Sequence, residues 1–379
     1  MRRFTGSAVV VAVSLAGFSL SARQVVPGVA SNAEVPPAML TSPPITATAG
    51  VTATLVVPPG TMYDPLSVLP RPGRTLWIND DGGVSGPRGG YVWTVDQRGR
   101  TGVLIDANRM MPSTGIDIAP KGFGAWGGQL FTLSTVTVER IGVRKSHIIE
   151  RVPPNGPTAS TTVCTLPDHG TVSGGAGAAG IEARFGPVGS PFANRFFSIT
   201  IANNTIYQTT ADGACTPFVT FDGSPWGLAF TADGSRMLVT VRKGASGLGG
   251  KATSGVIQAV RADGTIDPQP VFASGPTGIF DVEVAPRAFP QFGGQIFYTD
   301  WGPGGTDDLA KPPAFDGALY RIGPDGQAHL VASGFSNPAG IAFSDASIWV
   351  ADVNRDGPFY QSKWVADGFV VRLDVAKGR

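Results

Sequence analysis

The chain has 379 residues, a formal net charge of +1 and no block of like charge, so its electrostatics exclude nucleic acid or an acidic membrane surface as a partner. Glycine (52 residues) and proline (32 residues) are abundant, yet 42% of the residues are hydrophobic. This composition is typical of many short strands joined by tight turns, and it excludes a disordered chain.

The first 33 residues predict an export signal. Arg2 and Arg3 precede an apolar stretch from Val9 to Leu20, which is short for a membrane span. Small residues offer cleavage sites near 22–33. We therefore expect a secreted or periplasmic protein without a membrane span in its mature chain, an uncleaved anchor being the alternative. Residues 34–50 are rich in Pro, Ala, Ser and Thr and predict a linker with no core contribution.

From residue 51 onward one pattern recurs about every 50 residues: an inner strand, a turn, a second strand with a polar end, a long loop, a third strand and a Gly turn. "APKGFGAWGGQLF" (119–131) and "APRAFPQFGGQIF" (285–297) are two copies of its turn region. Units made of strands alone bury their faces only against neighbours, so the repeat predicts an all-β fold, a six-bladed β-propeller. The expected blades are 62–112, 113–167, 178–222, 224–275, 276–335 and 336–379 plus 51–60.

The last blade has no fourth strand of its own in the sequence. The segment 54–60 resembles the outer strand 328–334 of the fifth blade. We therefore expect the N-terminal strand to join the last blade and close the ring, which would remove the edges of an open sheet.

Cys164 and Cys215 are the two cysteines of the chain. In an exported protein such a pair often forms a disulfide. Both are expected on outer strands of successive blades, where the separation could be too wide for the bond. A disulfide and two buried thiols therefore both remain open.

Loop lengths predict one working face. The loops between second and third strands are long in several blades, and we call the end of the channel where they lie the long-loop face. A small molecule, or an extracytoplasmic protein or glycan, is expected to bind there, unless the loops merely cap the channel. Trp226 and Phe280 could form an apolar wall for a ring or sugar, or simply pack in the channel. The other ligand-binding candidates are Trp301, Arg355, Tyr360 and Trp364.

Acidic residues recur on the innermost strands. Carboxylates that converge on one axis need a cation, a basic group or water, and oxygen-rich channels suit Ca²⁺ or another divalent metal. The alternative is that these side chains lie between blades and pair with arginine. The metal candidates are Asp64, Asp117, Glu182, Asp281 and Glu283. By contrast, Asp80, Asp300 and Asp352 recur at the ends of second strands, which predicts a structural role such as binding loop amides.

Catalytic signals are weak. Asp64, His169 and Glu283 are candidates, His169 because it lies in an expected loop of the long-loop face and could act as a base. No Ser-His-Asp spacing, zinc motif, phosphate loop or dinucleotide fingerprint appears, so neither a nucleotide nor a flavin cofactor is expected.

"NPAGIAFSDASIWVAD" (337–352) and "SPWGLAFTADGSRMLVT" (224–240) resemble NHL-repeat and SMP-30/gluconolactonase-like propellers. The resemblance covers most of residues 51–379. It implies a divalent metal held at the channel mouth by one Glu, two Asn and one Asp. Asp64 falls near the place of the Glu, Trp226 occupies the place of one Asn, and Asp281 is shifted by one from the place of the Asp.

The sequence thus leaves three functions open. The first is an exported propeller, expected as a monomer, that binds a small molecule or partner without chemistry. The second is a metal-dependent lactonase or esterase of SMP-30 type that uses the central acids. The third is a structural scaffold of the cell envelope.

Overall fold

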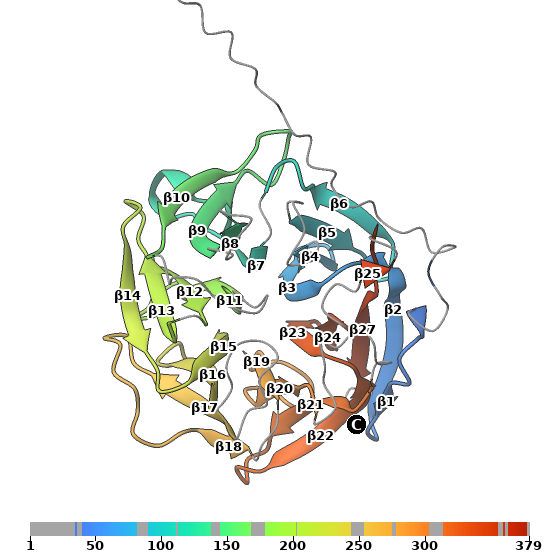
Figure 1. Ribbon diagram of the computed structural model, residues 1–379. Coiled ribbons are helices and arrows are strands. Elements are labelled where there is room, and N and C mark those ends of the chain that lie inside the picture. The colour runs from blue at the N-terminus through green and yellow to red at the C-terminus, as the bar shows by residue number, and fades with distance from the viewer. Residues whose placement is uncertain are drawn as a thin grey trace, which may run out of the picture.

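The computed structural model describes residue 35 and residues 40–81, 90–110, 113–137, 145–167, 179–201, 203–243, 254–274, 278–302, 314–354, 359–360 and 363–376. Six small antiparallel sheets lie around one axis, each with its first strand innermost (Figure 1). The fold is therefore the six-bladed β-propeller expected from the repeat. No helix of the described chain is long and apolar enough to cross a membrane.

Each blade has four strands, which run in order from the channel outward. Blade 1 holds β3 (Pro65–Arg71), β4 (Thr75–Asp80), β5 (Tyr91–Val95) and β6 (Thr101–Ile105), blade 2 holds β7 (Ser113–Ile118), β8 (Leu130–Thr137), β9 (Lys145–Val152) and β10 (Thr161–Thr165), and blade 3 holds β11 (Ala179–Phe185), β12 (Phe196–Thr200), β13 (Thr205–Thr209) and β14 (Cys215–Thr220). Blade 4 holds β15 (Ser224–Phe230), β16 (Met237–Lys243), β17 (Ser254–Val260) and β18 (Phe272–Ser274), blade 5 holds β19 (Ile279–Val284), β20 (Ile296–Asp300), β21 (Gly317–Ile322) and β22 (Ala328–Phe335), and blade 6 holds β23 (Pro338–Ser344), β24 (Ser347–Asp352), β27 (Gly368–Val375) and β2 (Val51–Met62). A separate two-stranded ribbon pairs β25 (Phe359–Tyr360) with β26 (Lys363–Trp364).

The ring closes as predicted. The outer strand of blade 6 is β2, which runs antiparallel to β27 with Thr54 opposite Arg372 and Leu55 opposite Val371 (Figure 1). The first and last strands of the propeller therefore share one sheet, and separating them would expose two long strand edges.

The segment expected to be a linker also takes part in the fold. A short strand, β1 (Thr46–Ala47), adds to the outer edge of blade 5 by pairing with β22. The amide and the hydroxyl of Thr48 both donate to the carbonyl of Val331, at 3.0 and 3.2 Å. Ile45 and Ala47 pack against the hydrophobic core of blades 5 and 6. This part of the linker therefore contributes to the core, because an outer strand as long as β22 offers it a free edge.

Aromatic side chains fill the space between blades. Phe123, from the turn after β7, packs on Phe131 of blade 2 and on Phe185 of blade 3, with ring centroids 5.5 and 4.8 Å apart. Phe289 holds the corresponding place in the second copy of this turn and packs on Phe343 of blade 6 at 4.8 Å. Edge-to-face contacts of this kind add to the free energy gained by burying the rings. The shared turn sequence therefore encodes an anchor between blades.

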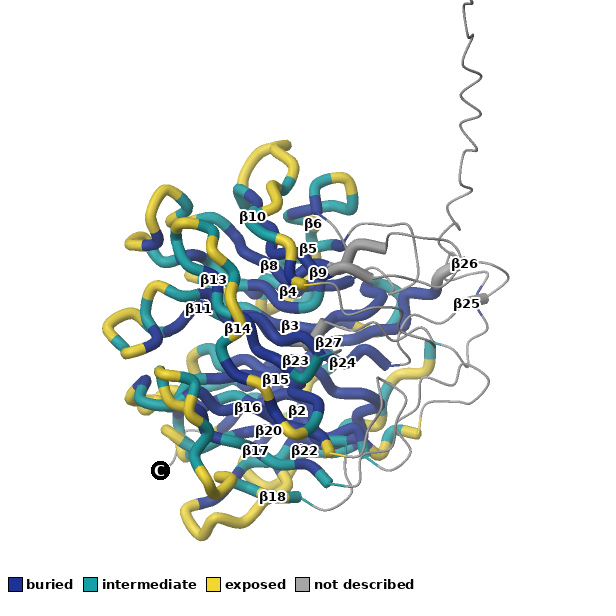
Figure 2. The backbone as a smooth tube through the Cα atoms, turned by 60° about the vertical axis from the view of Figure 1, so that its left-hand side comes forward, coloured by how far each residue is buried: buried dark blue, intermediate teal, exposed yellow. Residues whose placement is uncertain are grey.

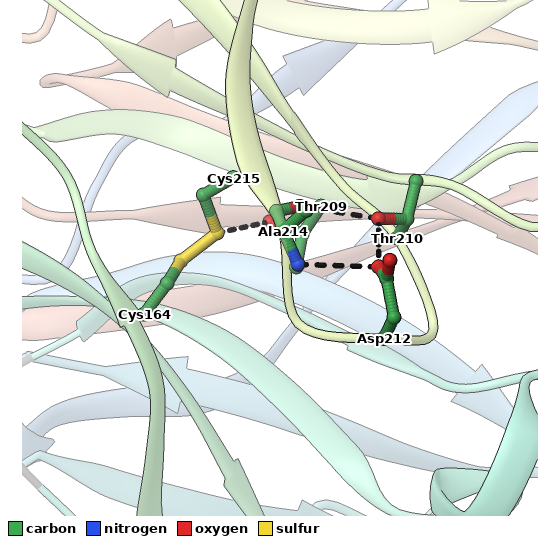
Figure 3. The surroundings of a disulfide bond; sticks show 6 residues. All are labelled: Cys164, Thr209, Thr210, Asp212, Ala214 and Cys215. Carbon is green, nitrogen blue, oxygen red and sulfur yellow. Dashed lines mark hydrogen bonds between the residues drawn. A yellow bond between two sulfur atoms is a disulfide. The ribbon is translucent and has the colours of Figure 1, made fainter.

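A disulfide joins two neighbouring blades at their outer strands. Cys164 of β10 and Cys215 of β14 are bonded, and their Cα atoms are 6.4 Å apart, within the usual range for the bond (Figure 3). The possibility that the blades stand too far apart is therefore excluded. The bond links the edges of blades 2 and 3, which belong to separate sheets.

Candidate functional site: the central channel

The acids at the ends of second strands organise the first residues of the inner strands. Asp352 accepts hydrogen bonds from the amides of Ser336, Asn337 and Asn354 at 2.7–3.1 Å. Burial raises the pKa of Asp352 to about 7, and the three amide donors oppose that rise. Its carboxyl therefore fixes the crossing from blade 5 into blade 6.

The same arrangement occurs in two other blades. Asp80 accepts from the amides of Tyr63 and Asp64, both at 3.0 Å. Asp300 accepts from the amides of Gly278 and Gly302, at 3.1 and 2.8 Å. The structural role predicted for these three acids is confirmed.

An aromatic plug fills the channel near the first residues of the inner strands. It consists of Trp226, Phe280 and Trp301, whose ring centroids are 4.4 to 6.1 Å apart. At most 5% of each residue is exposed. The guanidinium of Arg242 lies over Trp226 at 4.9 Å and over Trp301 at 5.8 Å. The plug belongs to the same hydrophobic cluster as Leu66 of blade 1 and Ala339 of blade 6. These three aromatic residues therefore fill the channel rather than line an open mouth.

A pocket of about 190 Å³ lies on the other side of the plug. Its walls come from the C-terminal halves of the inner strands β3, β7, β11, β19 and β23, so it opens where the turns to the second strands lie. We call this the turn-face pocket. Figure 2 shows described turns with exposed residues gathered at one end of the propeller. The pocket thus lies at the end of the channel opposite to the expected working face.

Four charged side chains line the turn-face pocket: Asp117, Glu182, Arg184 and Glu283. Arg184 of β11 donates from Nε and Nη2 to both carboxylate oxygens of Glu182, at 3.0 and 3.2 Å. Its Nη1 donates to Glu283 of β19. The guanidinium therefore bridges two carboxylates across the channel, in the charge-assisted fork geometry that arginine favours.

Two further carboxyls bind main-chain amides of other blades. Asp117 accepts from its neighbour Ile118 at 2.7 Å and from Phe185 of blade 3 at 2.8 Å. Asp281 accepts from its neighbour Val282 at 2.7 Å and from Ile341 of blade 6 at 2.8 Å. The prediction that inner-strand acids lie between blades and pair there thus describes these residues, although amides take part as well as arginine.

Burial and mutual repulsion shift the titration of this cluster. Burial, opposed by Arg184, raises the pKa of Glu182 to about 7. Burial and the charge of Glu182 raise the pKa of Asp281 well above its ordinary value, and burial also raises the pKa of Asp117. Burial disfavours the charged guanidinium, but Glu182 and Glu283 outweigh it and hold the pKa of Arg184 well above its usual range. The cluster therefore keeps its cation and holds protons near neutral pH.

The strand register corrects the sequence alignment of blade 3. Asp117 pairs with Phe131 and Glu283 pairs with Phe297, so these two acids are equivalent. The residue of blade 3 at this register is Arg184, which pairs with Phe197. Glu182, aligned with the other two acids from the sequence, is displaced by two residues because β11 is irregular between Ala179 and Ala183. The sequence signal for Arg184, a lone arginine inside an apolar inner strand, was missed.

The predicted metal ligands do not converge on one ion. Among the described residues no three His, Cys, Asp or Glu side chains form a group that could hold a metal. Asp64 is buried at the start of blade 1 and does not line the pocket. Trp226 is a plug residue, and both carboxylate oxygens of Asp281 already accept amides. The residues present therefore do not fit the metal set that the resemblance implies.

The remaining candidates fall at the limits of the described chain. His169 and Arg355 lie outside the described residues. Tyr360 and Trp364 lie on the ribbon β25–β26, where Phe359 pairs with Trp364 and Tyr360 with Lys363. Nothing in the described part brings these four residues to the turn-face pocket.

No protein-family model and no curated protein sequence matches the chain. Solved structures do. An oxidoreductase of Thermus thermophilus, described as a glucose dehydrogenase, is 17% identical with a TM-score of 0.54, over 86% of this chain and 100% of that one. A gluconolactonase of Xanthomonas campestris is 14% identical with a TM-score of 0.52, over 88% and 95%. The resemblance expected from the sequence is confirmed for the fold.

A third similar structure is the Trichoderma reesei carbohydrate-active enzyme of family AA12, 13% identical with a TM-score of 0.53, over 89% of this chain and 99% of that one. These proteins are named for different activities. At such low identity the shared scaffold establishes the architecture alone, and function must be argued from the site.

Proposed function

We propose that this protein binds a small organic molecule in the turn-face pocket, without a metal and without catalysing a reaction on it. The observation that carries the proposal is the pocket itself, a concave site with apolar walls and a small number of converging charged groups, which is the usual form of a ligand site. Its volume of about 190 Å³ suits a ligand smaller than a typical drug molecule, whose pockets are about 300 to 1,000 Å³.

The pocket is also rigidly built. Asp117 and Asp281 tie their strands to other blades through amide hydrogen bonds, and Arg184 joins blades 3 and 5. A site held on strands that are tied together loses little conformational freedom when a ligand binds, which favours affinity.

A metal-dependent lactonase or esterase is the weaker alternative. It is supported by the similar fold of a gluconolactonase, but at 14% identity this similarity concerns the fold alone. Trp226 and Phe280 are core residues where the family would place metal ligands. We therefore favour binding over hydrolysis.

We also propose that the protein acts outside the cytoplasm, as a secreted or periplasmic monomer. The basic and apolar N-terminal sequence supports this proposal, and so does the disulfide between Cys164 and Cys215. Disulfides persist in oxidising compartments and are rare in the cytosol.

The test is a screen of small fragments of both charges and of no charge by ligand-observed NMR, in the presence of a chelator. Val284 lines the pocket, so Val284→Phe places a ring in it, while Val271→Phe adds the same ring at an exposed site on another blade. We expect hits that persist with the chelator, vanish in Val284→Phe and remain in Val271→Phe. Melting curves of both variants establish that each is folded.

Two results would count against the proposed function. One is a set of hits that bind both variants equally, which would place the ligand elsewhere. The other is turnover of lactones or esters that stops when the chelator is added, which would restore the metal-dependent hydrolase.

A further inference from the structure

We infer that the ligand of the turn-face pocket is a compact organic cation, an ammonium or guanidinium group that carries a small apolar portion. This inference rests on the proposed function and names the class of ligand. It is drawn from the balance of charge in the pocket, the hydrogen bonds that its one cation already makes, and the chemistry of its walls.

The charge balance favours a cation. Three carboxyl side chains and one guanidinium line the pocket, so acids outnumber bases by two. A fourth acid, Asp281, lies close enough to Glu182 to raise its own pKa through their repulsion. Carboxylates that converge in a buried site are costly without a compensating charge, and a bound cation supplies one.

Arg184 is not available to an anion. Its Nε, Nη1 and Nη2 atoms all donate to Glu182 or Glu283. An anionic ligand would have to break these bonds and would then face carboxylates on two sides. Arg71, at the end of β3, lies over the ring of Trp77 at 4.6 Å and does not line the pocket. The described lining therefore offers acceptors to a cation and no uncommitted cation to an anion.

The walls favour an organic ion over a bare metal ion. Val68, Ile116 and Phe343 are among the apolar residues that surround the charged group. Contact between such walls and an alkyl or aromatic portion would contribute about 25 cal/mol for each Å² of apolar surface removed from water. A metal ion gains nothing from these walls, and no three described acids converge on one point.

Protonation of Glu182 should tune this affinity. The groups that face it are Arg184 on its own strand, Asp117 on β7, and Asp281 and Glu283 on β19. The pKa of Glu182 is raised to about 7. Glu182 therefore gains its negative charge as the pH rises through 7, and a cation should bind more tightly at pH 8 than at pH 6.

The experiment is a calorimetric titration with butylammonium, butanol and butyrate, which share a carbon chain and differ in charge, and with Ca²⁺ alone. At pH 8 we expect butylammonium to bind at least tenfold more tightly than butanol, and butyrate to show no binding. Affinity for butylammonium should fall severalfold at pH 6. Preference for butanol or butyrate, or binding of Ca²⁺ in place of butylammonium, would overturn the inference.

Two variants locate the effect. Glu283→Gln removes one pocket carboxylate, while Glu150→Gln makes the same change at a buried acid outside the pocket. We expect tenfold weaker butylammonium binding in the first variant and unchanged binding in the second. Should Glu283→Gln not fold, the wild-type series of three ligands still decides the charge preference. Hits in the fragment screen without charge preference sink the inference and leave the proposed function standing, whereas no hit that depends on the pocket sinks both.

Discussion

Arg184 of β11 and Glu283 of β19 form an ion pair across the channel, although they are 99 residues apart in the sequence. The pair joins blades 3 and 5. Ala229, which pairs with Leu238, occupies the corresponding register of the intervening blade 4, and its small side chain leaves the space between the two strands open. The pair is both a tie across the ring and part of the lining of the pocket.

Removing this cation should destabilise the fold. Arg184→Met would leave Glu182 and Glu283 close together without a counter-charge, and breaking such a pair on one side costs about 3 kcal/mol. We expect a loss of that order in the free energy of unfolding, measured with urea. Arg100→Met, at an exposed pair with Asp96, is the matched control and should cost less than about 1 kcal/mol. Equal losses in the two variants would contradict a special role for Arg184.

Stability should depend on pH through the raised carboxyl pKa values. The pKa of Glu182 is raised from 4.5 to about 7, and that of Asp352 from 3.8 to about 7. Between these limits the folded chain binds more protons than the unfolded chain, so its free energy of unfolding falls as the pH rises. We expect a higher melting temperature at pH 5 than at pH 8, and a smaller difference in Glu182→Gln. A melting temperature that rises across this interval by the same amount in both proteins would refute this view.

The carboxyl of Asp352 should be essential to the crossing into blade 6. Asp352→Ala leaves the amides of Ser336, Asn337 and Asn354 without their acceptor, and each unsatisfied buried group costs about 1–3 kcal/mol. We expect a loss of several kcal/mol on chemical denaturation. Asp374→Ala, at a partly exposed acid of the same blade, should cost far less. Similar losses in both variants would mean that the amide contacts carry little stability.

The disulfide should stabilise the propeller against unfolding. It closes a loop with a sequence separation of 51, for which the chain-entropy relation gives about 4 kcal/mol. We expect the double variant Cys164→Ser/Cys215→Ser to melt at a lower temperature, and a reducing agent to lower the melting temperature of the wild type only. Thiol titration of the unfolded wild type should find no free thiol. Two free thiols would contradict the bond.

The repeat pattern was enough to predict the six blades and the closing strand, because each blade repeats the same strand and turn chemistry. It also predicted the amide-binding acids Asp80, Asp300 and Asp352, whose recurrence indicated a structural role. The plug could not be predicted, because Trp226 and Phe280 look alike in sequence whether they line a mouth or fill a channel. Burial decided between the two.

The turn-face pocket depends on contacts between blades that a single repeat does not encode. Arg184 and Glu283 meet because the ring closes, and the irregular register of β11 sets which residues of blade 3 face the channel. The prediction of a site on the long-loop face followed loop length alone. Loop length does not report that aromatic side chains fill the channel beneath.

The most direct test of the central claim is a crystal soaked with 4-bromobenzylammonium, whose bromine is located by anomalous diffraction. We predict a bromine peak inside the turn-face pocket, near Val68 and Phe343, with the ammonium group directed at Glu283. A bromine peak at the opposite end of the channel, beyond Trp226, with the turn-face pocket free of ligand would contradict the account.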